Sequence, residues 1–166
     1  MEIERKWLIN TIPSDLEQYP HHIIEQGYLN TTPVVRVRRQ DELYILTYKG
    51  GGMMAREEYN LPLDAESYQH LVAKADGHII SKVRYIIPLD DGLKIELDHF
   101  SSPIKDLYLA EIEFESVEQA EAYTPPAWFG RDVTYDPRYH NSVMSKMYAA
   151  HSAKHLPYCA AAIRRA

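Results

Sequence analysis

A chain of 166 residues with 45% hydrophobic and 25% charged residues has the size and composition of a single folded domain. Its formal net charge of −6 argues against nucleic-acid binding by phosphate neutralisation, although a small phosphorylated ligand in a local basic pocket is compatible with it. Because Cys159 is the only cysteine, no apolar run approaches the about 18 residues of a membrane span, and no apolar leader is visible, we expect a cytoplasmic protein with no disulfide and no membrane partner.

Short runs of alternating polar and apolar residues dominate the chain and predict β-strands. In chain order the eight runs are MEIERKWLI, EQGYLNT, VVRVRRQ, ELYILTYKG, REEYNLPL, IISKVRYIIPL, LKIELDHF and LYLAEIEF. Turn residues separate them, including Pro20 and the glycines at 50–52.

Three segments have helical spacing. Residues 64–75 begin with the N-cap candidate Asp64, and residues 115–123 predict a second short helix. The segment 136–155 has a proline just inside its start and predicts the longest helix. We therefore expect one domain over residues 1–150 and a weakly ordered tail over 151–166.

Charges gather on one face of nearly every predicted strand. Side chains two residues apart share a face, so the alternation separates a charged face from an apolar one. The charged faces carry acidic pairs on three strands and basic pairs on two others: Glu2 with Glu4, Glu96 with Asp98, Glu111 with Glu113, Arg36 with Arg38, and Lys82 with Arg84. Further charges on the same faces are Lys6, Lys49, Arg56 and Glu58.

The plainest explanation is an antiparallel sheet with a solvated ionic face. However, acids and bases are segregated by strand, and the helices are too few to cover the apolar face of a flat sheet. A closed barrel removes the edges and turns the charges inward. We therefore predict an α+β fold with a closed eight-stranded antiparallel β-barrel, or tunnel, a few flanking helices and a C-terminal helix. Helices, loops or a second copy in a homodimer would cover the outside.

The charged residues suggest what the lumen holds. Carboxylates without imidazole or thiolate suit Mg²⁺ or Mn²⁺ rather than zinc, whereas guanidinium and ammonium groups suit phosphate oxygens. The metal-ligand candidates are Glu2, Glu4, Asp98, Glu111 and Glu113, and Glu58 and Glu96 are further tunnel acids. The phosphate-binding candidates are Lys6, Arg36, Arg38, Lys49, Arg56, Lys82 and Arg84. Such a lumen fits a linear triphosphate attacked by water.

EIERK at the N-terminus resembles the ExExK signature of the CYTH superfamily, the triphosphate tunnel metalloenzymes. The segments VRVR, LTYKG, REEYNL, KVRY, IELD, AEIEF and VTYDPRYHN follow in that family's order, and the chain is most similar to its small bacterial members. The resemblance implies an eight-stranded tunnel that hydrolyses a triphosphate with Mg²⁺ or Mn²⁺. It also implies that Lys82 or Lys6 polarises the attacking water.

Inorganic tripolyphosphate is the expected substrate, because no stretch suggests recognition of a base. Thiamine triphosphatase, nucleoside triphosphatase and adenylate cyclase activities on the same fold are the alternatives, as is a non-catalytic barrel that binds polyphosphate or nucleotide. The chain departs from the family pattern at Asn60, where an acid is frequent, and after Asn141, where a lysine is frequent and Lys146 is the nearest replacement.

Overall fold

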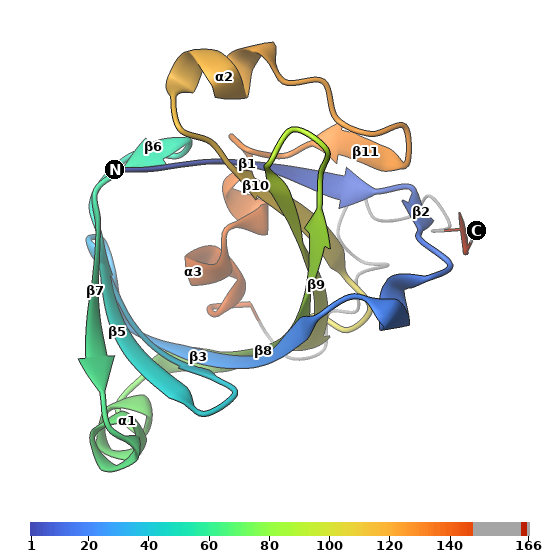
Figure 1. Cartoon of the computed structure of the whole chain (residues 1–166). Coiled ribbons are helices and arrows are strands. Elements are labelled where there is room, and N and C mark those ends of the chain that lie inside the picture. The colour runs from blue at the N-terminus through green and yellow to red at the C-terminus, as the bar shows by residue number, and fades with distance from the viewer. Residues whose placement is uncertain (148–163, 166) are drawn as a thin grey trace.

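The computed structural model describes residues 1–147 and 164–165 and is built almost entirely of β-strands (Figure 1). All eight predicted strands are present. They are β1 (Glu2–Ile9), β3 (His21–Thr31), β4 (Val34–Gln40), β5 (Leu43–Lys49), β7 (Glu58–Leu63) with the short β6 (Ala55–Arg56) before it, β8 (Asp76–Pro88), β9 (Lys94–Ser102) and β10 (Tyr108–Glu113). A strand that the sequence did not predict, β11 (Phe129–Asp132), joins the same sheet.

The sheet curls into a barrel whose strands follow the order β11, β1, β10, β9, β8, β3, β4, β5, β7 (Figure 1). All neighbours along this path are antiparallel. At the closing edge of β1, β6 pairs through Glu2 and Ile3, whereas β11 pairs through Trp7 and Ile9. The prediction of a closed eight-stranded barrel was therefore wrong in detail, because the barrel has nine strands and is nearly closed. β11 pairs with the part of β1 that β7 would pair with in a fully closed barrel.

The helices are short, so the fold is mostly β rather than α+β. They are α1 (Ala65–Val72), α2 (Val117–Ala122) and α3 (Asn141–Met144), with 3-10 turns η1 (Leu16–Gln18) and η2 (Pro137–Tyr139). Asp64 caps α1 by accepting a hydrogen bond from the Ser67 N–H, and Ser116 caps α2 in the same way. None of the helices within the described residues is long and apolar enough to span a membrane.

The long C-terminal helix that the sequence predicted from Asp136 is broken in the described part of the segment. His140 has an extended backbone, with φ −83° and ψ 131°, and separates η2 from α3. The break lets Tyr139 and Met144 both be buried, whereas on one continuous helix they would point about 140° apart. Residues 148–155 of that prediction lie outside the described residues.

The predicted tail also lies largely outside the described residues. Its two described residues form β12 (Arg164–Arg165), which pairs in parallel with β2 (Thr11–Ile12). The division into a domain over 1–150 and a tail over 151–166 stays a prediction.

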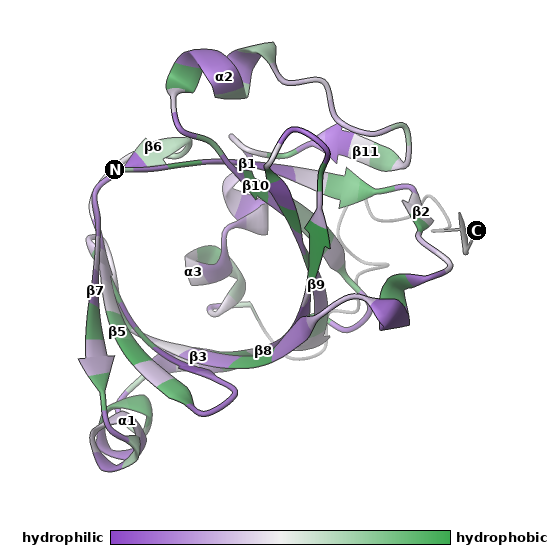
Figure 2. Cartoon of the chain, in the orientation of Figure 1, coloured by the Kyte–Doolittle hydropathy of each residue, from purple (hydrophilic) through white to green (hydrophobic). Residues whose placement is uncertain are grey.

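One hydrophobic core lies outside the barrel wall. The outward faces of β1, β8, β9 and β10 pack under α2 and β11, with Trp7, Leu97, Ile112 and Phe129 at most 5% exposed. Green and purple segments succeed one another along the strands in Figure 2, as a wall with one apolar face requires. The core holds the charge-bearing strands in place without occupying the lumen.

A second core closes one end of the lumen, and we call it the apolar plug. Figure 1 draws α3 inside the ring of strands. The plug combines inward-facing barrel residues with residues of the C-terminal segment: Leu8, Tyr28, Val34, Ile80, Phe100, Leu109, Tyr139 and Met144. On β1, β4, β8, β9 and β10, the charged residues share the inward face with a plug residue. The lumen therefore has an ionic part and a filled apolar end.

Candidate active site

The ionic part of the lumen is a cavity of about 240 Å³. All predicted site residues except Lys82 and Asp98 line it: Glu2, Glu4, Lys6, Arg36, Arg38, Lys49, Arg56, Glu58, Arg84, Glu96, Glu111 and Glu113. They converge because each occupies an inward position on a strand of the barrel. The charged faces thus point inward, as the sequence predicted.

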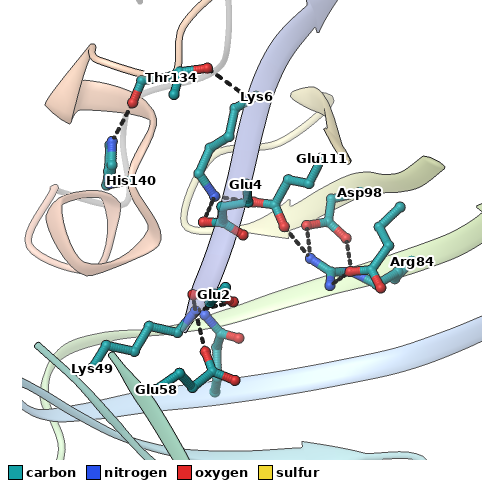
Figure 3. Close-up of polar contacts among 12 residues, drawn as sticks. Glu2, Glu4, Lys6, Lys49, Glu58, Arg84, Asp98, Glu111, Thr134 and His140 are labelled. Atoms are coloured by element: carbon teal, nitrogen blue, oxygen red, sulfur yellow. Dashed lines mark hydrogen bonds and ion pairs between the residues drawn. The ribbon is translucent and has the colours of Figure 1, made fainter. Parts of the chain in front are cut away.

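Lys6 joins two acids at the centre of the site (Figure 3). Its Nζ atom lies 2.8 Å from Glu4 Oε1 and 2.5 Å from Glu111 Oε1. Burial by itself would lower the pKa of Lys6, but the attraction of Glu111 and Glu4 outweighs burial and raises it. Lys6 is therefore a permanent cation, which suits phosphate binding and does not suit a general base.

Lys82 and Asp98 form a fully buried ion pair that faces into the barrel but does not line the cavity. Burial, followed by repulsion from Arg84, lowers the pKa of Lys82 to about 8. Arg84 connects this pair to the lumen, with Nε 2.6 Å from Asp98 Oδ1 and Nη2 2.7 Å from Glu111 Oε2 (Figure 3). Asp98 therefore forms ion pairs with two cations, Lys82 and Arg84.

Lys49 binds two acids from neighbouring parts of the barrel wall. Its Nζ atom is 2.5 Å from Glu2 Oε2 and 2.6 Å from Glu58 Oε2 (Figure 3). Burial and then the nearby Glu4 raise the pKa of Glu2 to about 7. Burial also opposes ionisation of Glu58, but Lys49 outweighs it and lowers that pKa to about 2. The two acids thus respond differently to one cation.

Three arginines form the part of the lining that we call the arginine wall: Arg36 and Arg38 on β4, and Arg56 on β6. Within the described residues, none of the three forms an ion pair with a carboxylate. Arg36 donates to Thr47 Oγ1 at 3.1 Å, and Arg38 donates to Gln26 Oε1 at 3.2 Å, so neutral groups orient them. Burial and then Arg36 lower the pKa of Arg38 to about 9. Unbalanced positive charge of this kind favours a polyanion.

Several acids share the lumen with the arginine wall. Glu113 has no cationic partner among the described residues, and burial followed by repulsion from Glu96 raises its pKa. Within the described ranges, no three acidic, histidine or cysteine groups already converge as a metal site. The donor set nevertheless fits a hard divalent cation, since several carboxylates share one small cavity with an acid that lacks a counter-charge.

Sequence reasoning missed the two ends of the cavity. The open mouth adds His22, Gln40, Ile86 and Lys94, and the end at the plug adds Tyr28, Val34, His140, Asn141 and Ser142. His22 and Tyr28 share the inward face of β3, so the alternation rule extended along that strand would have found them. The last three come from a turn whose position no strand periodicity predicts.

Comparison with known proteins places this site in a family. A profile of the CYTH domain matches residues 1–124. The chain belongs to the CYTH domain family. It is 40% identical over 149 residues to a protein of Nitrosomonas europaea named inorganic triphosphatase, covering 87% of this chain and 96% of that one. A protein of the same name from Acetivibrio thermocellus is 33% identical over 129 residues, covering 75% and 80%.

Solved CYTH structures resemble the fold. The crystal structure of an inorganic triphosphatase superposes with a TM-score of 0.67 at 35% identity, covering 89% of this chain and 97% of that one. A protein from Hippeastrum superposes with a TM-score of 0.57 at 18% identity, covering 73% and 83%, and supports the fold alone.

The two departures from the CYTH pattern have local partners in this barrel. Asn60 accepts from Thr47 Oγ1 at 2.7 Å and donates to Glu58 Oε1 at 2.6 Å, so it holds Glu58 beside Lys49. Lys146 donates to Thr31 Oγ1 at 2.7 Å and does not line the cavity. Lys146 therefore does not replace a cavity lysine in this structure.

Proposed function

We propose that this protein hydrolyses inorganic tripolyphosphate in the ionic lumen, using Mg²⁺ or Mn²⁺. The observation that carries the proposal is the arginine wall, whose cations form no ion pair with a carboxylate among the described residues and share a cavity of about 240 Å³ with a group of acids. Cations without carboxylate partners bind phosphate oxygens, and grouped carboxylates bind divalent cations. The kinship with two proteins named inorganic triphosphatase supports the same substrate.

The cations would divide the work of binding the substrate. Arg36, Arg38 and Arg56 would hold the phosphate chain, and guanidinium groups can do so bidentately. Lys6 and Lys49 would add point charges within the lumen. Each now donates a hydrogen bond to a carboxylate there, and a metal ion that bound these carboxylates would leave the ammonium groups available to phosphate. Arg84, which lines the cavity, would bind a phosphate oxygen. Lys82 would hold Asp98 in place, and Asp98 in turn would hold Arg84.

The acids would hold the metal. The cavity lining contains Glu2, Glu4, Glu111 and Glu113, with Glu58 and Glu96 beside them. Asp98 does not line the cavity and would act by positioning Arg84. A bound divalent cation would neutralise phosphate charge as the leaving group departs. The carboxylates would meanwhile release part of their present hold on Lys6 and Lys49.

The lining favours an inorganic substrate. Tyr28 is the only phenylalanine, tyrosine or tryptophan among the described lining residues, and it lies at the plug end rather than the mouth. A purine or thiazolium ring at the mouth would therefore find little aromatic surface for stacking. Thiamine triphosphate, nucleoside triphosphates and ATP cyclisation are accordingly the second choice. A cytoplasmic location and a homodimer stay predictions.

A phosphate-release panel tests the proposal. Tripolyphosphate, pyrophosphate, ATP and thiamine triphosphate are each incubated with the protein and Mg²⁺, Mn²⁺ or EDTA. We expect rapid release from tripolyphosphate with metal and none with EDTA. A rise in melting temperature without turnover would indicate a binding barrel instead, since any ligand of the folded state stabilises it. No turnover and no shift would reject the lumen as a triphosphate site.

A further inference from the structure

His140 is an inward-facing imidazole that the charge pattern does not account for. It lies between η2 and α3, is 9% exposed, and lines the cavity at its plug end beside Asn141 and Ser142. α3 lies inside the ring of strands (Figure 1), and His140 is its N-cap, so the side chain reaches the lumen from the plug rather than from a strand.

The ring has a defined tautomer. Its Nε2 atom is 3.1 Å from the Thr134 carbonyl oxygen, which can only accept a hydrogen bond, so Nε2 carries a proton (Figure 3). In a neutral imidazole the other nitrogen, Nδ1, is then an acceptor. None of the described residues donates a hydrogen bond to Nδ1, and Nδ1 is not completely buried. His140 therefore offers a free lone pair at the cavity.

Thr134 holds the ring in position. The Thr134 N–H donates to Asp132 Oδ1 at 2.8 Å, and its Oγ1 accepts from the Lys6 backbone N–H at 3.0 Å. Thr134 is 1% exposed, so its carbonyl has little freedom. The orientation of His140 is thus tied to β1, the strand that carries Glu2, Glu4 and Lys6 into the site.

The surroundings keep this imidazole neutral. Burial lowers the pKa of His140, the positive charges of Lys6 and Arg56 lower it further, and the Thr134 carbonyl and Glu4 oppose them without reversing the shift. Near pH 7 the ring is mostly an acceptor. A phosphate oxygen has no proton to give it, but a water molecule has.

Lys6, Lys82 and Glu111 each lack one requirement of a general base in the lumen. Lys6 is held protonated by Glu4 and Glu111, and Lys82 is fully buried in its ion pair with Asp98 and does not line the cavity. Glu111 is engaged by Lys6 and Arg84. His140 alone among these groups combines access to the cavity with an unengaged lone pair.

On the basis of the proposed triphosphatase function, we infer that His140 accepts the proton of the attacking water through Nδ1. The water oxygen forms a bond to the terminal phosphorus, and the bridging P–O bond breaks with its electron pair leaving on pyrophosphate. The water proton passes to Nδ1, and the imidazolium then loses it to solvent. Proton transfer to a positioned base of this kind contributes about 100-fold or more to a rate.

The test is His140→Gln with His70→Gln as its matched control. Glutamine can still donate to the Thr134 carbonyl but has no acceptor in the place of Nδ1. We expect kcat for tripolyphosphate with Mg²⁺ to fall about 100-fold while KM stays within about twofold. In the wild type, kcat should decline as pH falls through the His140 pKa, and this acid limb should vanish in the variant. His70 is exposed on α1, which lies outside the ring of strands, so its replacement should leave kcat unchanged.

The outcomes separate the inference from the function on which it rests. Wild-type protein without turnover would reject the proposed function itself. Turnover in the wild type with an undiminished kcat and acid limb in His140→Gln would overturn the role of His140. A raised KM at unchanged kcat would also overturn it, by making His140 a phosphate ligand. If the glutamine variant melts early, His140→Asn, which puts a carboxamide oxygen near Nδ1 but cannot take the proton, should show the same lost limb.

Discussion

Glu2 and Lys49 are 47 positions apart in the chain, yet their side chains form a 2.5 Å ion pair across the closing seam of the barrel. Glu2 lies on β1 and Lys49 on β5, at the two sides of the seam that β6 bridges with only two residue pairs. The same ammonium holds Glu58 on β7. The ion pairs therefore supplement a short run of backbone pairing where the barrel is least closed.

Replacing Lys49 with methionine should destabilise the barrel. Both Glu2 and Glu58 would remain buried without their cation, and breaking a buried pair costs about 3–5 kcal/mol, less here because both acids keep some solvent contact. Urea unfolding should give a lower midpoint. Lys105→Met, in an exposed loop, is the control and should leave it unchanged. An equal midpoint in both variants would show that Lys49 is not part of the seam.

Glu2 should make the metal-free protein less stable as pH rises. Its pKa is raised from 4.5 to about 7 in the folded state, so between these values the folded protein binds more protons than the unfolded chain. The stability that protonated Glu2 contributes is present below pH 4.5 and is lost as pH rises through 7. In EDTA, the free energy of unfolding should fall from pH 5 to pH 8, and less steeply in Glu2→Gln. Identical slopes would contradict the shift.

Arg36 and Arg39 provide a paired test of the arginine wall, because they lie on opposite faces of β4. Arg36 faces the cavity, whereas Arg39 donates to the Asp41 carbonyl on the outside. Loss of a hydrogen bond from a charged group costs about 1.5–3 kcal/mol. Arg36→Met should therefore raise KM for tripolyphosphate by about 10- to 100-fold, with Arg39→Met close to wild type. Equal KM values in the two variants would show that the arginine wall does not bind the substrate.

The apolar plug should be worth measurable stability. Met144 is fully buried in it, whereas Val143 is 37% exposed. Met144→Ala should lower the free energy of unfolding by about 2–5 kcal/mol, and Val143→Ala by about 0.5 kcal/mol or less. Chemical unfolding followed by tryptophan fluorescence measures both. Similar small losses would mean that the plug packs loosely.

Alternation along the strands was enough to predict the inward face and nearly all of the acidic and basic residues that line the cavity. It also contained a signal that the prediction did not use. On five of the charged strands the next inward position toward one end is apolar: Leu8 follows Lys6, Val34 precedes Arg36, Ile80 precedes Lys82, Phe100 follows Asp98, and Leu109 precedes Glu111. Because these changes fall at one level of the barrel, they mark the plug.

Closure and the C-terminal segment could not be predicted from local pattern. Whether β1 pairs with β7 or with β11 depends on long-range competition for one edge, which no window of sequence contains. Likewise, the helical spacing after Asp136 is interrupted at His140 because Tyr139 and Met144 must both enter the plug. Tertiary packing decided both features.

The most direct test of the central claim is product analysis by ³¹P NMR with tripolyphosphate and Mg²⁺, for the wild type and for Glu111→Ala combined with Glu113→Ala. We predict that the wild type converts each tripolyphosphate into one phosphate and one pyrophosphate, and that the double variant does so at least about 100-fold more slowly while a cooperative melting transition shows that it is folded. Full activity in the double variant would contradict the account, because the acids of the lumen would then have no part in the reaction.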